Sequence, residues 1–254
     1  MKFICYCFFL IIFQSAAIAQ PAKYTVSNAH SHNDYEQANP FWAAYNAGFG
    51  SIEADIFLRE NQLLVAHEEK ELVNKRTLED LYLKPLQSCI EKQKGFVYSD
   101  TTRQLQLLID IKTDSIATLN KLITVLQNYP AIINNPSVKI VITGGRPVAD
   151  QFPSYPSFIL FDGNVGTVYS EASLAKIAML SSSFKNYSQW NGTGTLPQKD
   201  KAVLKAEIDK AHALRKPIRF WEAPDLPNAW HHLMQLKVDF INTDHISELA
   251  AFLK

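Results

Sequence analysis

The chain has 254 residues, of which 47% are hydrophobic and 20% charged, and its 25 basic side chains balance its 25 acidic ones. This length suits one large α/β domain or two small ones. A formal net charge of zero excludes the broad basic surface of a typical nucleic-acid-binding protein and the acidic tail of a charged interaction segment.

Residues 1–19 have the pattern of a secretory signal peptide. Lys2 supplies a positive start, residues 4–13 are almost wholly apolar, and Ala17-Ile18-Ala19 matches a small-residue cleavage site. The apolar run is too short for a spanning helix, although an N-terminal anchor is the alternative. We therefore expect a secreted or periplasmic mature chain, residues 20–254, with no stable membrane anchor after cleavage.

The cysteines agree with a fold held together by its core alone. Cys5 and Cys7 lie inside the predicted signal peptide, so the mature chain keeps only Cys89. One cysteine cannot form an internal disulfide. Cys89 lies in a predicted helix, and we expect it to be a buried apolar residue there.

Strands and helices alternate along the mature chain. The predicted strands are 26–30, 51–58 (extended after a turn by 63–67), 105–111, 138–143, 157–161, 179–184, 217–221 and 238–242. The predicted helices are 40–47, 77–94, 115–128, 172–178, 199–214, 228–236 and 246–253. Many of these strands are continuous apolar runs, as parallel strands covered on both faces should be. Eight such units predict a single-domain (β/α)₈ TIM barrel, with a doubly wound open sheet as the alternative.

Two acidic residues stand out in the second predicted strand. Side chains at positions i and i+2 of a strand point to the same face, so Glu53 and Asp55 point together. Two neighbouring carboxylates repel each other unless a positive charge lies between them, and a hard divalent cation prefers oxygen ligands. The pair therefore indicates a metal site, and a solvated strand face with two surface acids is the alternative.

Polar residues gather where the predicted strands end, which is where TIM barrels place their active sites. These residues are His30, Glu53, Asp55, His67, Asp110, Lys112, Arg146, Asp162, Asn164, Trp221, Glu222, Asn242 and Asp244. Their shared position predicts one polar site at that rim of the barrel.

The order of these residues resembles a known superfamily, the phosphatidylinositol-phospholipase-C-like phosphodiesterases. Glycerophosphodiester phosphodiesterases and spider-type sphingomyelinase D enzymes belong to it. The resemblance rests on His30, the Glu53-x-Asp55 pair, His67 followed by an acid, and Asp110-x-Lys112. It extends over nearly the whole mature chain, including residues 219–221 and 242–244. The string at 30–35, His-Ser-His-Asn-Asp-Tyr, is most similar to the branch named for the yeast protein "altered inheritance of mitochondria 6".

This resemblance implies a metal centre and two acid–base groups. Glu53, Asp55 and Asp110 would hold one divalent cation, Mg²⁺ or Ca²⁺, while His30 and His67 would act as general base and acid. In the family the nucleophile is typically a hydroxyl of the substrate itself. The expected activity is that of a phosphoric diester hydrolase on a glycerophosphodiester or (lyso)phospholipid-type substrate, without a nucleic-acid partner.

Candidate substrate contacts lie at the same rim. Lys112 would place positive charge on the phosphate, and Asn33, Arg146 and Trp221 would line the substrate site. Several site residues have an alternative role. Lys112 could pair structurally with Asp110, His67 could be a surface histidine, Arg146 a solvated loop residue and Trp221 a packing residue at the rim. His32 either contacts phosphate or holds its loop. The chain departs from glycerophosphodiesterases where it has His-Ser-His in place of His-Arg-Gly and Asp110 in place of Glu, which leaves the substrate open.

Two other functions are compatible with parts of this pattern. His30-x-His32 is also how metal-dependent amidohydrolases begin, but those enzymes need further histidines after the strands 157–161 and 179–184, and none follows there. A barrel that binds a phosphorylated ligand or a metal without turnover is the second alternative. The intact set of two histidines and three carboxylates argues against this second alternative.

Overall fold

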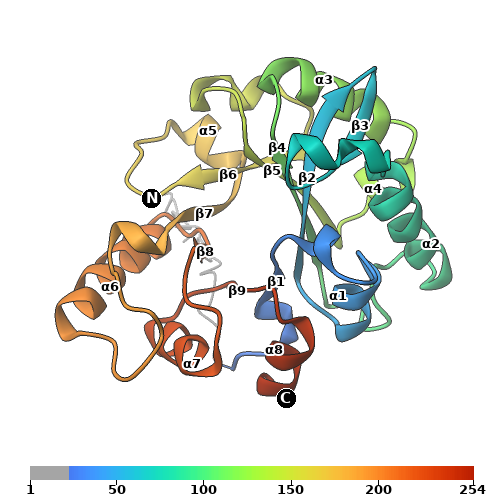
Figure 1. The fold of residues 1–254 in the computed structure, drawn as a ribbon. Helices are drawn as coiled ribbons and strands as arrows, with labels where there is room; N and C mark the ends of the chain where they lie inside the picture. Colours follow the sequence, from blue (N-terminus) through green and yellow to red (C-terminus); the bar gives the residue numbers. More distant parts are fainter. Residues whose placement is uncertain (1–22) are drawn as a thin grey trace, which may run out of the picture.

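The computed structural model describes residues 23–254 as a nearly closed barrel of eight parallel strands (Figure 1). The barrel strands are β1 (Ala29–Ser31), β2 (Ser51–Arg59), β4 (Leu105–Ile111), β5 (Val138–Gly144), β6 (Ile159–Asn164), β7 (Ile177–Ser183), β8 (Ile218–Trp221) and β9 (Ile241–Thr243). They follow the order β8-β7-β6-β5-β4-β2-β1-β9, and a parallel bridge between Arg219 and Phe240 brings β8 next to β9. The predicted (β/α)₈ architecture is confirmed. The predicted signal peptide lies outside the described residues.

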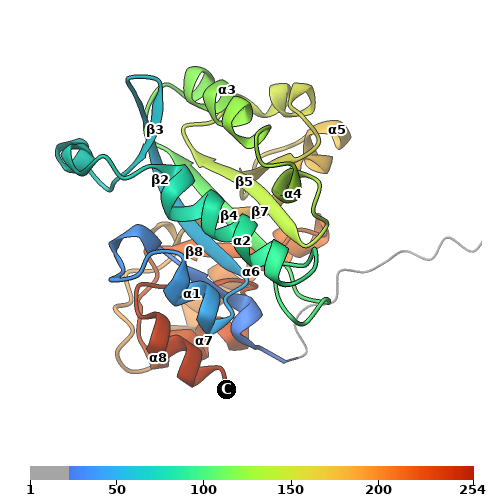
Figure 2. The ribbon, with the colours of Figure 1, turned by 90° about the vertical axis from the view of Figure 1, so that its right-hand side faces the viewer.

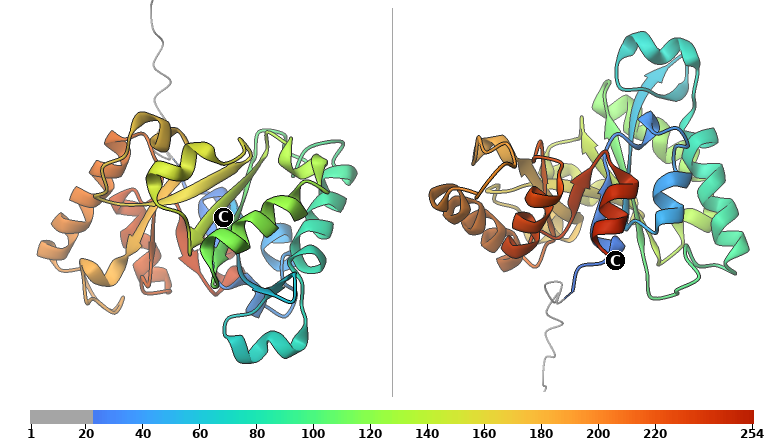
Figure 3. Two further views of the ribbon diagram at one scale, coloured as in Figure 1. Left: turned by 90° about the horizontal axis from the view of Figure 1, so that it is seen from above. Right: turned by 60° about the horizontal axis from the view of Figure 1, so that its bottom comes forward.

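Helices cover the outside of the barrel (Figures 2 and 3). The α-helices are α1 (Trp42–Ala47), α2 (Lys84–Lys92), α3 (Ser115–Leu126), α4 (Pro130–Ile133), α5 (Glu171–Ala175), α6 (Gln198–Ala213), α7 (Pro227–Leu236) and α8 (Ile246–Phe252). Short 3₁₀ or π turns are η1 (Val26–Asn28), η2 (Asp34–Glu36), η3 (Glu69–Asn74), η4 (Glu79–Leu83), η5 (Ala149–Ser154) and η6 (Phe184–Asn186). Within residues 23–254, no helix is long and apolar enough to cross a membrane.

A ninth strand, β3 (Gln62–Val65), runs antiparallel to β2 and forms a hairpin with it. Glu60 and Asn61 have φ angles of 47° and 62°, the positive values that a tight two-residue hairpin turn needs. The strand predicted for 63–67 ends at Val65, whose amide donates to the carbonyl of Arg76. The chain between these two residues makes an excursion that projects from the barrel (Figure 2), and His67 lies at its base.

The first and last barrel strands begin later than their apolar patterns predict. In place of a strand at 26–28, η1 forms because Thr25 accepts from the Ser27 amide and Asn28 accepts from the Thr25 amide. Near the C-terminus β9 begins at Ile241, because the Asp239 side chain accepts from the amide of Ile218 and interrupts the regular ladder. In both places side-chain oxygens accept backbone amide protons in competition with strand pairing; the bonds are local at η1 and join β8 to the chain before β9 at Asp239.

Other helix and strand boundaries differ by a few residues from the predicted ones. The helix predicted for 172–178 ends at Ala175, because Ile177 already pairs with Phe161 as the first residue of β7. The strand β6 continues to Asn164, so the predicted rim residue Asp162 lies on the strand itself. The predicted helix 77–94 consists of the π turn η4 followed by α2, in which Cys89 is buried and free as expected.

Alternation along β2 separates the core from the site. Ile52, Ala54 and Ile56 are fully buried in the hydrophobic core, while Glu53 and Asp55 point to the other face of the strand. Fully burying each of these isoleucine side chains contributes about 1.5–3 kcal/mol. The same apolar packing therefore fixes the direction of the two carboxylates.

Candidate active site

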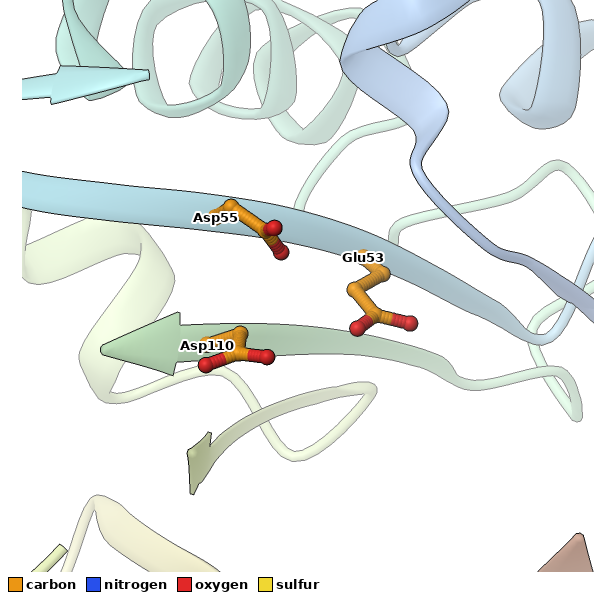
Figure 4. Close-up of side chains that lie close together, drawn as sticks. All are labelled: Glu53, Asp55 and Asp110. Carbon is orange, nitrogen blue, oxygen red and sulfur yellow. The ribbon is translucent and has the colours of Figure 1, made fainter. Parts of the chain in front are cut away.

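Three carboxylates converge on the barrel interior from two neighbouring strands. Asp55 on β2 pairs directly across from Asp110 on β4, and Glu53 lies two residues earlier on β2. Each offers a carboxylate oxygen within 4.8 Å of those of the other two (Figure 4). The structure thus brings together all three residues that the sequence predicts as metal ligands.

The chemistry of this cluster fits a divalent cation. Asp55 Oδ1 and Asp110 Oδ1 are buried and have no hydrogen-bond partner within residues 23–254. Burial, followed by the charges of Glu53 and Asp110, raises the pKa of Asp55 to about 6. The Lys112 ammonium lies 2.9 Å from Asp55 Oδ2 and 2.8 Å from Asp110 Oδ2. Lys112 and the Arg219 guanidinium, 3.0 Å from Glu53, are two positive charges beside three carboxylates, and the cluster keeps free oxygens of the kind that Mg²⁺ and Ca²⁺ bind.

Glu53 is held as an anion by two buried partners. His30 Nε2 lies 2.7 Å from Glu53 Oε2, and Arg219 donates from Nη1 to the same oxygen over 3.0 Å. Burial alone would raise the pKa of Glu53, but Arg219 and His30 outweigh it and hold that pKa well below its usual range. These contacts use Oε2 and leave Oε1 for a cation.

Both ring nitrogens of His30 have polar partners within hydrogen-bond distance. Gln106 donates from Nε2 to Ser51 Oγ, 3.1 Å away, and Ser51 lies 2.8 Å from His30 Nδ1. His30 Nε2 lies 2.7 Å from Glu53 Oε2 and also 2.7 Å from Arg219 Nη1, so it contacts both an acceptor and a donor. Burial and the nearby Arg219 lower the pKa of His30 to about 4, so the ring is neutral at pH 7.

His67 is connected to the carboxylates through a buried tyrosine. The hydroxyl of Tyr35 donates to Asp55 Oδ2 over 2.7 Å and lies 3.1 Å from His67 Nδ1. A hydroxyl has one proton, and the carboxylate is its strongest nearby acceptor, so His67 donates its Nδ1 proton to Tyr35. The side chain of His67 is half exposed, and its Nε2 has no hydrogen-bond partner in the described chain.

The segment that carries Tyr35 is tied down by the buried Asp34. Its carboxylate accepts from the hydroxyls of Ser31 (2.8 Å) and Tyr82 (3.0 Å) and from the amide of Phe41 (2.5 Å). Asn33, just before it, adopts a left-handed conformation with φ 43°, which Asn tolerates better than most residues. This local folding places Asn33 and Tyr35 over the end of β1.

A cavity of about 370 Å³ opens above the carboxylate cluster. It is lined by His32, Asn33, Glu53, His67, Asp110, Lys112, Thr143, Gly144, Arg146, Asn164, Ser181, Arg219 and Trp221. The four residues predicted to bind substrate are all among them. His30 and Asp55 lie beneath the lining, each almost wholly buried.

Two family models and several curated proteins are similar to this chain. The model of the AIM6-like phosphodiesterase domain matches residues 22–131, and that of the glycerophosphoryl diester phosphodiesterase family matches residues 217–246. The altered inheritance of mitochondria protein 6 homolog of Arthroderma benhamiae is 27% identical over 260 residues, covering 88% of this chain and 82% of that protein. The altered inheritance of mitochondria protein 6 of Kluyveromyces lactis is 26% identical, covering 89% and 72%.

A solved structure shares the fold. The glycerophosphodiester phosphodiesterase from Parabacteroides distasonis superposes with a TM-score of 0.56 at 14% identity, over 89% of this chain and 96% of that one. Together these similarities support the resemblance to the phosphatidylinositol-phospholipase-C-like phosphodiesterase superfamily and to its AIM6-like branch.

The two family matches divide the AIM6-like site into two parts. The carboxylates, His30 and His67 fall within residues 22–131, and Arg219 falls within residues 217–246. The residues between these matches supply the rest of the cavity: Thr143, Gly144, Arg146, Asn164 and Ser181. Arg146 donates to Thr143 Oγ1 over 3.2 Å and to Asn164 Oδ1 over 2.6 Å, and the Trp221 side chain is 40% exposed beside them.

Several site residues were not predicted from the sequence. Tyr35 lies inside the recognised string, and Arg219 is the first residue of a recognised triplet, but neither had an assigned role. Asp162, expected at the rim, is fully buried and accepts from Thr143 and Ser181 instead of facing the cavity. Strand alternation on β5 and β7 was the available signal for Thr143 and Ser181.

A larger cavity of about 570 Å³ lies at the opposite end of the barrel, where the strands begin. Its lining includes Gly50, Gln104 and Pro217, which precede β2, β4 and β8, together with Arg103 and Lys139. None of the three clustered carboxylates reaches it. TIM-barrel enzymes use the other end, so we assign the site to the smaller cavity.

Proposed function

We propose that this AIM6-like chain is a metal-dependent phosphoric diester hydrolase. The observation that carries the proposal is the pair of unpartnered buried oxygens, Asp55 Oδ1 and Asp110 Oδ1, beside Glu53. These three residues would hold one divalent cation, Mg²⁺ or Ca²⁺. When bound there, such an ion supplies Lewis-acid polarisation of a phosphoryl oxygen and offsets the charge of the transition state.

The chain's own residues would bind the phosphate and move protons. Lys112 and Arg146 place positive charge on the cavity wall, where an anionic diester would be attracted and oriented. His67 presents the unprotonated Nε2 to the cavity because Tyr35 accepts its Nδ1 proton, so His67 is placed to take the proton of the attacking hydroxyl or water. His30, the second acid–base group that the family resemblance implies, orients Glu53 in this geometry.

The cavity supports a substrate whose buried part is polar. Thr143, Arg146, Asn164 and Ser181 offer hydroxyl, amide and guanidinium groups, and Trp221 adds one aromatic wall. We propose a glycerophosphodiester or a (lyso)phospholipid-type diester whose phosphate and polar substituent enter the cavity. An acyl chain, where present, would stay outside it.

We also propose that the chain is exported, with residues 1–19 as a cleaved signal peptide. The support is the basic start, the apolar run and the Ala-Ile-Ala site of the sequence. Mass spectrometry of the protein isolated from the periplasm or medium would detect a mature N-terminus at Gln20. An uncleaved chain that stays with the membrane fraction would contradict export as a free protein.

The experiment that tests the activity is hydrolysis of bis-p-nitrophenyl phosphate and glycerophosphocholine in Mg²⁺, Ca²⁺ or EDTA. Turnover should need the cation, and Asp55→Asn and His67→Ala should each reduce it by about 10²-fold or more. Asp150→Asn, which changes an exposed aspartate away from the cavity, is the matched control. Cation binding through Asp55 without turnover would favour a non-catalytic binding barrel, and no cation binding would refute the metal site.

The structure does not favour an amidohydrolase. Such an enzyme needs histidines after the strands that correspond to β6 and β7. The cavity residues on these strands are Asn164 and Ser181, and the part of the chain that the structure describes holds no mixed histidine–carboxylate metal cluster.

A further inference from the structure

His32 lines the cavity, whereas His30 is buried beneath it. His32 follows β1 directly, its amide donates to the carbonyl of Thr243, and its side chain lines the cavity with 31% of its surface exposed. The side chain of His30 is 0% exposed, and both of its ring nitrogens already have partners, Ser51 and Glu53. Of the two histidines on this strand, His32 is the one that a bound diester can reach.

Asp244 holds the ring of His32 in place. His32 Nδ1 lies 2.8 Å from Asp244 Oδ1, so the imidazole donates its Nδ1 proton to the carboxylate. Asp244 follows β9 and is itself fixed, because its amide donates to Asp225 Oδ2 (2.7 Å) and its carbonyl accepts from Gln37 (2.9 Å). His32 Nε2 has no hydrogen-bond partner within residues 23–254 and remains available at the cavity.

The surroundings also favour a protonated ring. Burial by itself would lower the pKa of His32, but the hydrogen bond to Asp244 and the charge of Glu53 raise it above its ordinary value. His67 has no such carboxylate bonded to its Nδ1, which faces a tyrosine hydroxyl at 3.1 Å. The two cavity histidines therefore have different hydrogen-bond partners, as an acid and a base require.

We propose that His32, oriented by Asp244, is the general acid that protonates the leaving alcohol of the diester. This inference rests on the proposed phosphodiesterase function. A water or substrate hydroxyl forms the new P–O bond and gives its proton to His67 Nε2. The P–O bond to the leaving group breaks, and the oxygen keeps the electron pair and takes the Nε2 proton of His32. The products are an alcohol and either a phosphate monoester, after attack by water, or a cyclic phosphodiester, after attack by the substrate hydroxyl. Solvent takes the proton from His67 and returns one to His32, without any redox partner.

A general acid matters most when the leaving group is basic, which separates this role from a structural one. The test uses two diesters of glycerol 3-phosphate in saturating Mg²⁺. Glycerophosphocholine releases choline, an alkoxide-type leaving group that needs a proton. Glycerol 3-(p-nitrophenyl phosphate) releases p-nitrophenolate, which departs without one. Wild type, His32→Ala, Asp244→Asn and His30→Ala are compared, with Mg²⁺ affinity measured on each by calorimetry.

We expect His32→Ala to lose about 10²–10⁴-fold in kcat with glycerophosphocholine but less than about tenfold with the nitrophenyl diester. Asp244→Asn, which changes a positioning residue, should show the same pattern to a smaller degree. Both variants should keep wild-type Mg²⁺ affinity, since neither residue belongs to the carboxylate cluster. His30→Ala should weaken Mg²⁺ binding and slow both diesters alike, because it frees Glu53.

Equal losses with both diesters in His32→Ala would overturn the inference and leave the phosphodiesterase proposal standing. A leaving-group-dependent loss in His30→Ala would also overturn it, by assigning the acid to the buried histidine. Failure of the wild type to turn over either diester, with intact Mg²⁺ binding, would instead refute the proposed function on which the inference rests.

Discussion

Gly144 at the end of β5 lies against Asp110 on β4 so closely that a Cβ atom at Gly144 would overlap Asp110 Oδ1. Gly144 also has φ +67°, a conformation that disfavours any side chain. The position of the unpartnered Asp110 Oδ1 therefore depends on the absence of a side chain at Gly144 on the neighbouring strand.

Gly144→Ala should weaken divalent-cation binding by tenfold or more, because the new methyl group displaces the Asp110 carboxylate. Gly166→Ala is the matched control: Gly166 has a similar φ of +85° but no heavy atom within 4 Å of its Cβ position. Both substitutions carry about 1–2 kcal/mol of backbone strain, and only the first reaches the cluster. Calorimetric titration with Mg²⁺ compares them, and equal affinities would contradict the prediction.

Asp55→Asn should abolish cation binding yet stabilise the metal-free protein near neutral pH. Folding raises the pKa of Asp55 to about 6 from an ordinary 3.8, so the protonated form is favoured in the folded state. Its contribution to stability is present at low pH and is lost as the pH rises through about 6. At about 1.4 kcal/mol per pKa unit, the neutral amide should gain on the order of 3 kcal/mol above that pH.

Urea unfolding in EDTA at about pH 4 and about pH 7.5 measures this effect of Asp55. The difference between Asp55→Asn and wild type should grow with pH, whereas Asp150→Asn should show no such growth. The same linkage predicts that the wild type binds Mg²⁺ more weakly below about pH 6, where a proton occupies the cluster. A pH-independent difference would refute the assignment of Asp55 as the buried acid.

Tyr35→Phe should lower kcat by about tenfold to a hundredfold with little loss of fold. It removes the hydroxyl that Asp55 Oδ2 and His67 Nδ1 share, so His67 loses the partner that fixes its tautomer. Tyr98→Phe is a suitable control, since it deletes another buried hydroxyl, bonded to the carbonyl of Phe49 at 2.6 Å, away from the cavity. Each change should cost about 1 kcal/mol of stability.

The ¹⁵N chemical shifts of His67 show whether Tyr35 fixes the tautomer of His67 or only packs against it. Wild type should show Nδ1 protonated and Nε2 unprotonated at high pH, and Tyr35→Phe should show a mixture of the two tautomers. Tyr98→Phe should leave both the shifts and kcat as in wild type. An unchanged His67 tautomer in Tyr35→Phe would mean that the tyrosine only packs there.

Lys112→Met should destabilise the protein in EDTA by about 1–3 kcal/mol, because Asp55 and Asp110 lose the ammonium that lies between them. Saturating Mg²⁺ should recover most of that loss, so the cation should raise the melting temperature more than in wild type. Lys199→Met, at an exposed position on α6, should behave as wild type in both buffers. Equal destabilisation of Lys112→Met with and without Mg²⁺ would show that the lysine is structural.

Local sequence patterns were enough to predict much of the fold and of the candidate site. The apolar runs and their helical partners predicted eight βα units, and the i, i+2 rule directed Glu53 and Asp55 to one face because strand side chains alternate regardless of context. Asp110, Lys112 and Arg146 were then added because TIM barrels place their active sites where the strands end, and parallel strands all end at the same side of the barrel. The strand starts predicted at residues 26 and 238 were wrong. The side chains of Asn28 and Asp239 accept hydrogen bonds from backbone amides there, and a pattern of apolar residues does not reveal such bonds.

Only the closed barrel decided which residues work together. Asp244 follows His32 by 212 positions and Arg219 follows Glu53 by 166. Both pairs meet because β9 pairs with β1 and β8 lies next to β9 across the barrel closure. No local period encodes such contacts. The sequence by itself determined the set of chemical groups and the strand faces that carry them. The tertiary structure decided that His30 is buried against Glu53 while His32 faces the cavity, because strand pairing around the ring, not residue spacing, sets burial.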